Sequence, residues 1–158
     1  MTFDHLLNKV PVNPEQVHVM RTDIEPEQSA LEYQKMLHTY FGTEGNSFDL
    51  VLSGMGDDGH TLSLFPGTEV IHETKGWVKA FYLTAQQMYR ITLTAPVVNR
   101  ASSVVFLTFG ANKAKALYEV LEGEPNADIY PSQIIQPASG KLHWFVDEPA
   151  AALLDKKA

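Results

Sequence analysis

The sequence contains no cysteine among its 158 residues. This absence excludes disulfide-linked scaffolds, thiolate zinc sites and cysteine nucleophiles. A chain of this length buries roughly two-thirds of the surface that its unfolded form exposes, so it can build a core without such cross-links. We therefore expect residues 1–158 to form a single domain.

Positive charge and long apolar runs are also scarce. The chain has 12 Lys and Arg against 19 Asp and Glu, so its formal net charge is −7. This balance argues against nucleic acid or an anionic membrane as a partner and leaves room only for a small, locally held phosphate. No stretch approaches the roughly 18 apolar residues of a membrane span, and the N-terminus lacks the pattern of a signal peptide. We expect a cytoplasmic protein.

Short apolar strands alternate with helices along the chain. Residues 26–41 have apolar side chains at helical spacing and end at Gly42, and residues 103–109 form the clearest buried strand. A helix over 111–122 follows that strand. The other expected strands cover residues 48–53, 77–83, 90–94 and 142–146, and the other short helices 60–65, 95–101 and 148–154. This alternation predicts an α/β fold with a largely parallel sheet.

The turn after the strand at 48–53 has an unusual composition. It places three glycines and two aspartates before one histidine: Gly54, Gly56, Gly59, Asp57, Asp58 and His60. Ligands of parallel α/β sheets bind at the carboxyl ends of strands, where this turn stands. At the start of a helix His60 would stay neutral and able to accept a proton, and a neighbouring carboxylate would fix its tautomer. Such an arrangement suits a general base.

Other interpretations of this turn remain open at this point. Glycine and aspartate are ordinary turn residues, so His60 could simply cap or pack. The six histidines show no metal-ligand spacing around carboxylates, and Ser53 and Ser63 do not stand in a Gly-x-Ser-x-Gly elbow. A dinucleotide site would use the Gly-x-Gly pair, but no acidic residue at the end of a second strand supports it.

A second turn, Gly110 to Lys113, follows the strand at 103–109. A lysine in the first turn of a helix opposes the helix dipole, which favours an anion there. A bound phosphate would resolve this conflict, because backbone amides and the ammonium group could share it. A solvated lysine is the simpler interpretation of this turn taken alone.

Several motifs together resemble the 6-phosphogluconolactonases in order and spacing. They are residues 54–61 with 63–67, Arg90–Thr94, Gly110 with Lys113–Ala114, and Trp144–Glu148. The resemblance implies a doubly wound, Rossmann-like sheet and hydrolysis of 6-phospho-D-glucono-1,5-lactone to 6-phosphogluconate in the pentose phosphate pathway, with no metal or cofactor. The related glucosamine-6-phosphate deaminases carry an Asn-Glu-Pro stretch where this chain has Leu64-Phe65-Pro66.

The resemblance also implies a role for each candidate residue. His60 would be the base and Asp58 or Asp57 its orienting partner. Lys113 would anchor the phosphate, with Arg90 as a second cation. Backbone amides of the turn would contact substrate, at Gly54, Gly56 and Gly59.

The chain departs from the family pattern in its first part. Family members normally begin with a strand–helix unit that carries a phosphate loop, followed by an Asp-Glu-Arg segment, whereas the match here starts near Val17. We therefore expect an N-terminally truncated chain, equivalent to the C-terminal two-thirds of a lactonase-like domain. An unpaired strand edge in such a chain would favour self-association. The alternative functions are a catalytically inactive sugar-phosphate-binding fragment and a deaminase-like isomerase.

Overall fold

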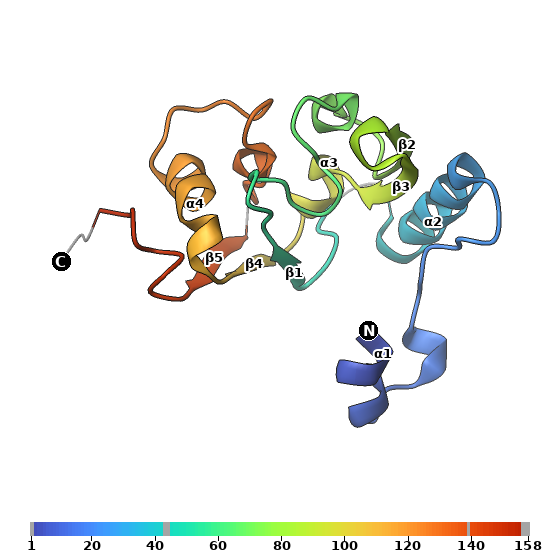
Figure 1. Cartoon of the computed structure of the whole chain (residues 1–158). Coiled ribbons are helices and arrows are strands. Elements are labelled where there is room, and N and C mark those ends of the chain that lie inside the picture. Colours follow the sequence, from blue (N-terminus) through green and yellow to red (C-terminus); the bar gives the residue numbers. More distant parts are fainter. Residues whose placement is uncertain (1, 43–44, 139, 156–158) are drawn as a thin grey trace.

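Three parallel strands form the larger sheet of this computed structural model, which describes residues 2–42, 45–138 and 140–155. The strands β1 (Val51–Gly54), β4 (Ser103–Thr108) and β5 (Lys141–Val146) stand in the order β1-β4-β5 (Figure 1). In the register of the sheet, Gly54 lies beside Leu107, and Leu107 lies beside Phe145. The carboxyl ends of all three strands therefore meet at one edge.

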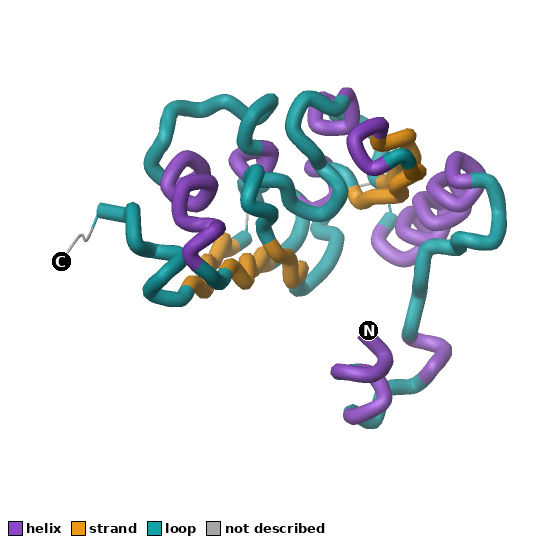
Figure 2. The backbone as a smooth tube through the Cα atoms, in the orientation of Figure 1, coloured by secondary structure: helices purple, strands orange, loops and turns teal. Residues whose placement is uncertain are grey.

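The second sheet is an antiparallel hairpin of β2 (Val78–Leu83) and β3 (Met88–Leu93). The helix α2 (Pro26–Phe41) lies beside this hairpin (Figure 2). The side-chain oxygen of Gln34 on α2 accepts hydrogen bonds from the amides of Trp77 and Val78 at 2.7 and 3.2 Å. The hairpin is thus tied to the helix at the start of β2.

The remaining helices are short. They are α1 (Thr2–His5), α3 (Ala95–Val98) and α4 (Ala114–Leu121), and 3₁₀ turns cover Leu7–Lys9, Pro14–Gln16, Glu69–His72, Thr84–Gln86, Ala111–Lys113 and Pro131–Ile134. The segment with α1 extends away from the rest of the chain, whereas α4 lies over β4 and β5 (Figure 1). No helix within the described ranges is long and apolar enough to cross a membrane.

The two faces of the parallel sheet differ in burial. One face carries Val104 and Phe106, both fully buried, and the ring of Phe106 stacks on Trp144 with centroids 3.9 Å apart. Side chains of alternate residues point to the opposite face, where Leu52, Leu107 and Phe145 are 60%, 44% and 58% exposed. The core therefore lies on the α4 side of the sheet.

The α/β fold with a parallel sheet is confirmed, and most expected elements are present with bounds that differ by no more than three residues. Two expected helices are wrong. Residues 60–65 form a tight turn in which Thr61 bridges Leu64, because Leu62 adopts a left-handed φ of 55° that a helix cannot accommodate. Residues 148–154 also form turns, where the Asp147 carboxylate accepts a hydrogen bond from the Ala150 amide at 3.0 Å.

Candidate active site

The turn after β1 and the turn after β4 lie at the same edge of the parallel sheet. Gly54, the last residue of β1, pairs with Leu107, and Gly110 follows three residues later. The Gly110 amide donates to both carboxylate oxygens of Asp147, at 2.9 and 3.1 Å, and Asp147 itself follows β5. This bond joins the ends of β4 and β5 beside the glycine-rich turn.

Asp58 holds the imidazole ring of His60. Its Oδ1 atom accepts a hydrogen bond from the His60 amide at 3.0 Å and lies 2.6 Å from Nδ1 of the same residue. An ionised carboxylate can only accept, so in the neutral ring the proton belongs to Nδ1 and the lone pair to Nε2. A ring in this tautomer can remove a proton from water.

The charge of Asp58 is maintained by these contacts. Burial raises the pKa of its carboxyl group. Hydrogen bonds from the amide and ring of His60 lower the pKa, and together they outweigh burial, so the pKa lies below its ordinary value of 3.8. The side chains of Asp58 and His60 are 46% and 28% exposed. Asp58 is therefore an ionised acceptor at neutral pH, and solvent reaches the pair.

Gly56 makes the close approach of this pair possible. A Cβ atom at this position would collide with Nδ1 of His60 and with Oδ1 of Asp58. The Gly56 amide also donates to the carbonyl oxygen of His60 at 2.8 Å. The turn thus closes on itself only because residue 56 has no side chain.

Gly59 connects the turn to a distant segment of the chain. Its φ of +78° lies in the left-handed region that favours glycine, and a Cβ atom there would lie 2.8 Å from the Tyr130 ring. The Gly59 carbonyl accepts hydrogen bonds from the amide and the hydroxyl of Ser132, at 3.0 and 2.8 Å. Sequence reasoning missed Tyr130 and Ser132, because nothing local links them to a turn more than 70 residues earlier.

A buried hydroxyl supports the first residue of the turn. The Thr61 hydroxyl donates to the carbonyl oxygen of Gly54 at 2.9 Å and lies 2.6 Å from the Ser53 hydroxyl. Thr61 is almost completely buried. Together with Ser132, it fixes both ends of the turn that carries Asp58 and His60.

The ring of Phe65 lies against His60. The two ring centroids are 4.2 Å apart and the planes are inclined by 25°, which is a stacked arrangement. The Arg90 guanidinium carbon lies 5.8 Å from the centroid of the Phe65 ring. Phe65 therefore contacts both His60 and Arg90.

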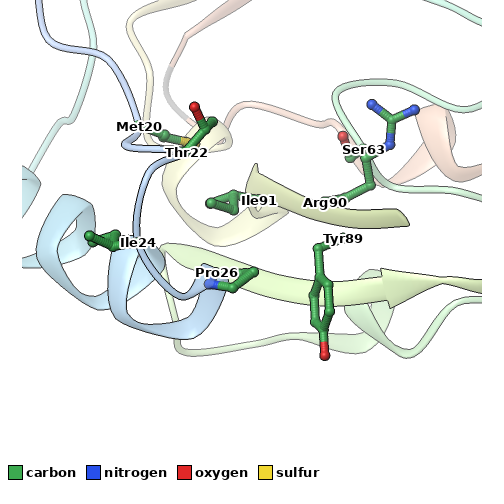
Figure 3. A pocket seen from close by; sticks show the side chains of 8 residues that line it. All are labelled: Met20, Thr22, Ile24, Pro26, Ser63, Tyr89, Arg90 and Ile91. Atoms are coloured by element: carbon green, nitrogen blue, oxygen red, sulfur yellow. The ribbon is translucent and has the colours of Figure 1, made fainter. Parts of the chain in front are cut away.

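Arg90, on β3, also lines a cavity of about 350 Å³ (Figure 3). Polar side chains of Thr22 and Ser63 share this cavity with apolar ones. One guanidinium nitrogen of Arg90 donates to the side chain of Gln86, while Nε is buried and has no hydrogen-bond partner among the described residues. Arg90 thus contacts the ring of Phe65, which in turn stacks on His60.

Among the described residues, neither Lys113 nor Asp57 forms a side-chain hydrogen bond or an ion pair with Asp58 or His60. Lys113 ends the 3₁₀ turn before α4, its side chain is half-buried, and within the described ranges it forms no ion pair with an acidic side chain. Asp57 is exposed, and its side chain makes no hydrogen bond to another described residue. Of the two aspartates, the geometry therefore selects Asp58 as the partner of His60.

The surroundings of the three glycines differ from those of a dinucleotide-binding turn. Gly54, Gly56 and Gly59 have the spacing Gly-x-Gly-x-x-Gly, but a tight turn follows them instead of the helix that a dinucleotide fingerprint opens. Because residues 60–65 form this turn, no helix dipole acts on His60, and that expectation is wrong. Among residues 2–42, 45–138 and 140–155, no group of three or more His, Asp or Glu side chains is placed to hold a metal ion.

The family model described as glucosamine-6-phosphate isomerases/6-phosphogluconolactonase matches residues 1–144. The chain belongs to this family. The resemblance that the motifs indicated is therefore confirmed, and the parallel sheet agrees with it.

Individual relatives agree over most of this chain. The human 6-phosphogluconolactonase is 38% identical over 154 residues, which are 95% of this chain and 58% of the human protein. A Synechocystis 6-phosphogluconolactonase is 40% identical over 148 residues, which are 91% of this chain and 60% of that protein. The crystal structure of the devB protein matches with a TM-score of 0.85 at 27% identity, covering 97% of this chain and 65% of that one. The chain thus spans about three-fifths of the length of these curated family members.

Proposed function

We propose that this chain hydrolyses 6-phospho-D-glucono-1,5-lactone to 6-phosphogluconate, the reaction of the pentose phosphate pathway that the family resemblance implies. The observation that carries the proposal is the hydrogen bond between Asp58 and Nδ1 of His60, which leaves Nε2 as the basic atom of the site. The lactonase names of the human and Synechocystis relatives support it.

In the first step, Nε2 of His60 takes a proton from a water molecule as the water oxygen attacks the lactone carbonyl carbon. The new carbon–oxygen bond forms while the carbonyl electron pair moves to its oxygen, giving a tetrahedral oxyanion. Asp58 stabilises the resulting imidazolium, because its carboxylate stays negative. Backbone amides of the turn from Gly54 to Gly59 are the proposed donors to the oxyanion.

In the second step, the carbonyl re-forms and the bond from the former carbonyl carbon to the ring oxygen breaks. The ring oxygen leaves as a hydroxyl group after it takes the proton from Nε2 of His60. The carboxylic acid product then loses a proton to water. His60 thus returns to its starting state after one turnover, and no other group has to be oxidised or reduced.

The phosphate needs an anchor away from the reacting carbon. Lys113 is the proposed anchor, since it stands at the same sheet edge as the turn and within the described residues its ammonium group has no carboxylate partner. Arg90 is the proposed second cation, because it lines a cavity and packs on Phe65 next to His60.

A cytoplasmic location and self-association of the chain remain predictions.

A lactonase assay on the purified chain, with spontaneous hydrolysis subtracted, tests the proposal. We expect catalysed hydrolysis that His60→Ala lowers about a hundredfold or more, the usual contribution of a general base. A chain that binds 6-phosphogluconate without catalysing hydrolysis would be a sugar-phosphate-binding protein instead. An active chain whose His60→Ala variant stays within about threefold of its rate would show that another group is the base.

A further inference from the structure

The hydrogen bond from Asp58 holds the imidazole ring of His60 at a single ring atom, Nδ1. The ring is otherwise attached only through its bond to Cβ, so coupled rotations about χ1 and χ2 can tilt its plane while the distance of 2.6 Å from Nδ1 to Asp58 Oδ1 is kept. Such a tilt moves Nε2, on the far side of the ring, away from the direction in which it must meet a water molecule. A second contact, on the face of the ring, is needed to fix its plane.

Phe65 provides that contact. Its ring stacks on the imidazole with centroids 4.2 Å apart and planes inclined by 25°. The two residues are five positions apart, and the left-handed Leu62 between them turns the chain back so that their rings can meet. The stack is therefore produced by the same local fold that replaces the expected helix.

Phe65 is itself held firmly. The residue is only 9% exposed. Its carbonyl oxygen accepts hydrogen bonds from the hydroxyl and the amide of Thr68, at 2.6 and 3.2 Å. Arg90 lies over its ring at 5.8 Å, within the range of a cation–π contact. A buried aromatic ring with a fixed backbone can restrain the plane of the imidazole, whose side chain is only 28% exposed.

We infer that Phe65 is a positioning residue, whose ring fixes the plane of His60 so that Nε2 keeps its productive direction. The catalytic consequence rests on the proposed function, in which His60 is the base. The geometric part does not depend on it, because the orientation of a histidine ring can be measured without turnover.

The catalytic test compares three variants with the wild-type chain. Phe65→Leu removes the ring but keeps an apolar side chain, Phe65→Tyr keeps the ring, and Phe106→Leu removes a ring from another buried stack, that of Phe106 on Trp144. We expect Phe65→Leu to lower kcat about tenfold to a hundredfold, because small misplacements of a catalytic group have effects of this size. We expect its KM to change by less than about threefold, and Phe65→Tyr to recover most of the lost kcat.

The geometric test uses NMR spectra of the wild-type chain, in which His60→Ala identifies the His60 signals. The ring protons of His60 should be shifted upfield of those of the exposed His143, because they lie in the ring current of Phe65. This measurement remains available if Phe65→Leu does not fold. In folded Phe65→Leu, the upfield shift should disappear.

Several results would overturn the inference. Unshifted His60 ring protons in the wild-type chain would contradict the stack. An equal loss of kcat in Phe65→Leu and Phe106→Leu would show a general effect of core destabilisation, and an unchanged kcat in Phe65→Leu would show that the ring plane needs no second restraint. If the wild-type chain proves inactive, the proposed function fails, whereas the spectra still decide whether the Phe65 ring stacks on His60.

Discussion

Asp58 Oδ1 lies 2.6 Å from Nδ1 of His60, whereas the neighbouring Asp57 is exposed and forms no hydrogen bond to another described residue. The two aspartates are adjacent in sequence and chemically identical, so they form a matched pair for mutation. Only Asp58 is in a position to select the tautomer of His60, the proposed base.

Asp58→Asn should therefore lower kcat strongly. The amide keeps the size of the side chain but can present its NH₂ group to Nδ1, which favours the wrong tautomer and removes the negative charge beside the imidazolium. We expect a loss of about tenfold to a thousandfold in kcat, measured at saturating lactone with the spontaneous rate subtracted. Asp57→Asn is the control and should stay within about twofold. Equal losses in both variants would contradict the assignment of Asp58.

Lys113→Ala should weaken substrate binding more than turnover. A phosphate anchor far from the carbonyl acts equally on the bound substrate and the transition state, so its loss appears mainly in KM. A charge-assisted contact is worth about 1.5–3 kcal/mol, which is roughly tenfold to a hundredfold in KM. Lys115→Ala, which removes an exposed lysine on α4, is the control. An unchanged KM with a collapsed kcat would place Lys113 in the chemistry instead.

The features that could be predicted from the sequence depend on short-range patterns. The regular apolar spacing of residues 26–41, with Gly42 after them, predicts this helix to the residue. Strand β4 was likewise clear from a run of apolar residues bounded by Gly110. The pairing of Asp58 with His60 is also local, since it joins residues two positions apart.

Other features depend on contacts that no local pattern contains. The helix expected at 60–65 fails at Leu62, where the chain adopts a left-handed conformation and the Ser63 amide donates to the Thr92 hydroxyl at 3.1 Å, 29 residues away. The support of Gly59 by Ser132 is of the same kind. The arrangement of β2 and β3 as a separate hairpin could not be read from their sequences, because apolar spacing does not say which strands pair.

Glu73 should make the stability of the chain sensitive to acid. Its carboxylate accepts a hydrogen bond from Lys79 at 2.8 Å and others from the amides of Gly76 and Lys75, and these contacts lower its pKa from 4.5 to about 2. A carboxyl group whose pKa is lower in the folded state stabilises that state fully above the unfolded value, and the contribution is lost as the pH falls toward the folded value. The sensitive window therefore runs from about 4.5 down to about 2.

Urea unfolding of wild type and Glu73→Gln across this window checks the prediction. The difference in the free energy of unfolding between the two proteins should be largest near neutral pH and should shrink as the pH approaches about 2. Glu69→Gln is the control, because Glu69 is exposed and its side chain makes no hydrogen bond within the described ranges. A difference that does not vary between neutral pH and the bottom of the window would show that Glu73 acts by packing rather than by its charge.

The exposed face of the parallel sheet should cause self-association. Leu52, Leu107 and Phe145 lie on that face, each more than 40% exposed, and within the described residues β1 is an edge strand. Exposed apolar patches and unpaired strand edges both favour contact with another chain.

We expect the average mass in light scattering to rise with protein concentration. Leu52→Lys should reduce this rise, because lysine on an edge strand opposes pairing. The added positive charge makes the net charge of −7 less negative and so weakens the repulsion between molecules, but we expect the effect on pairing to be larger. Leu31→Lys makes the same change of charge at an exposed leucine on α2 and should leave the association unchanged. A constant monomer mass for the wild-type chain at all concentrations would contradict the prediction, and an equal effect of both variants would assign the association to charge instead of the sheet face.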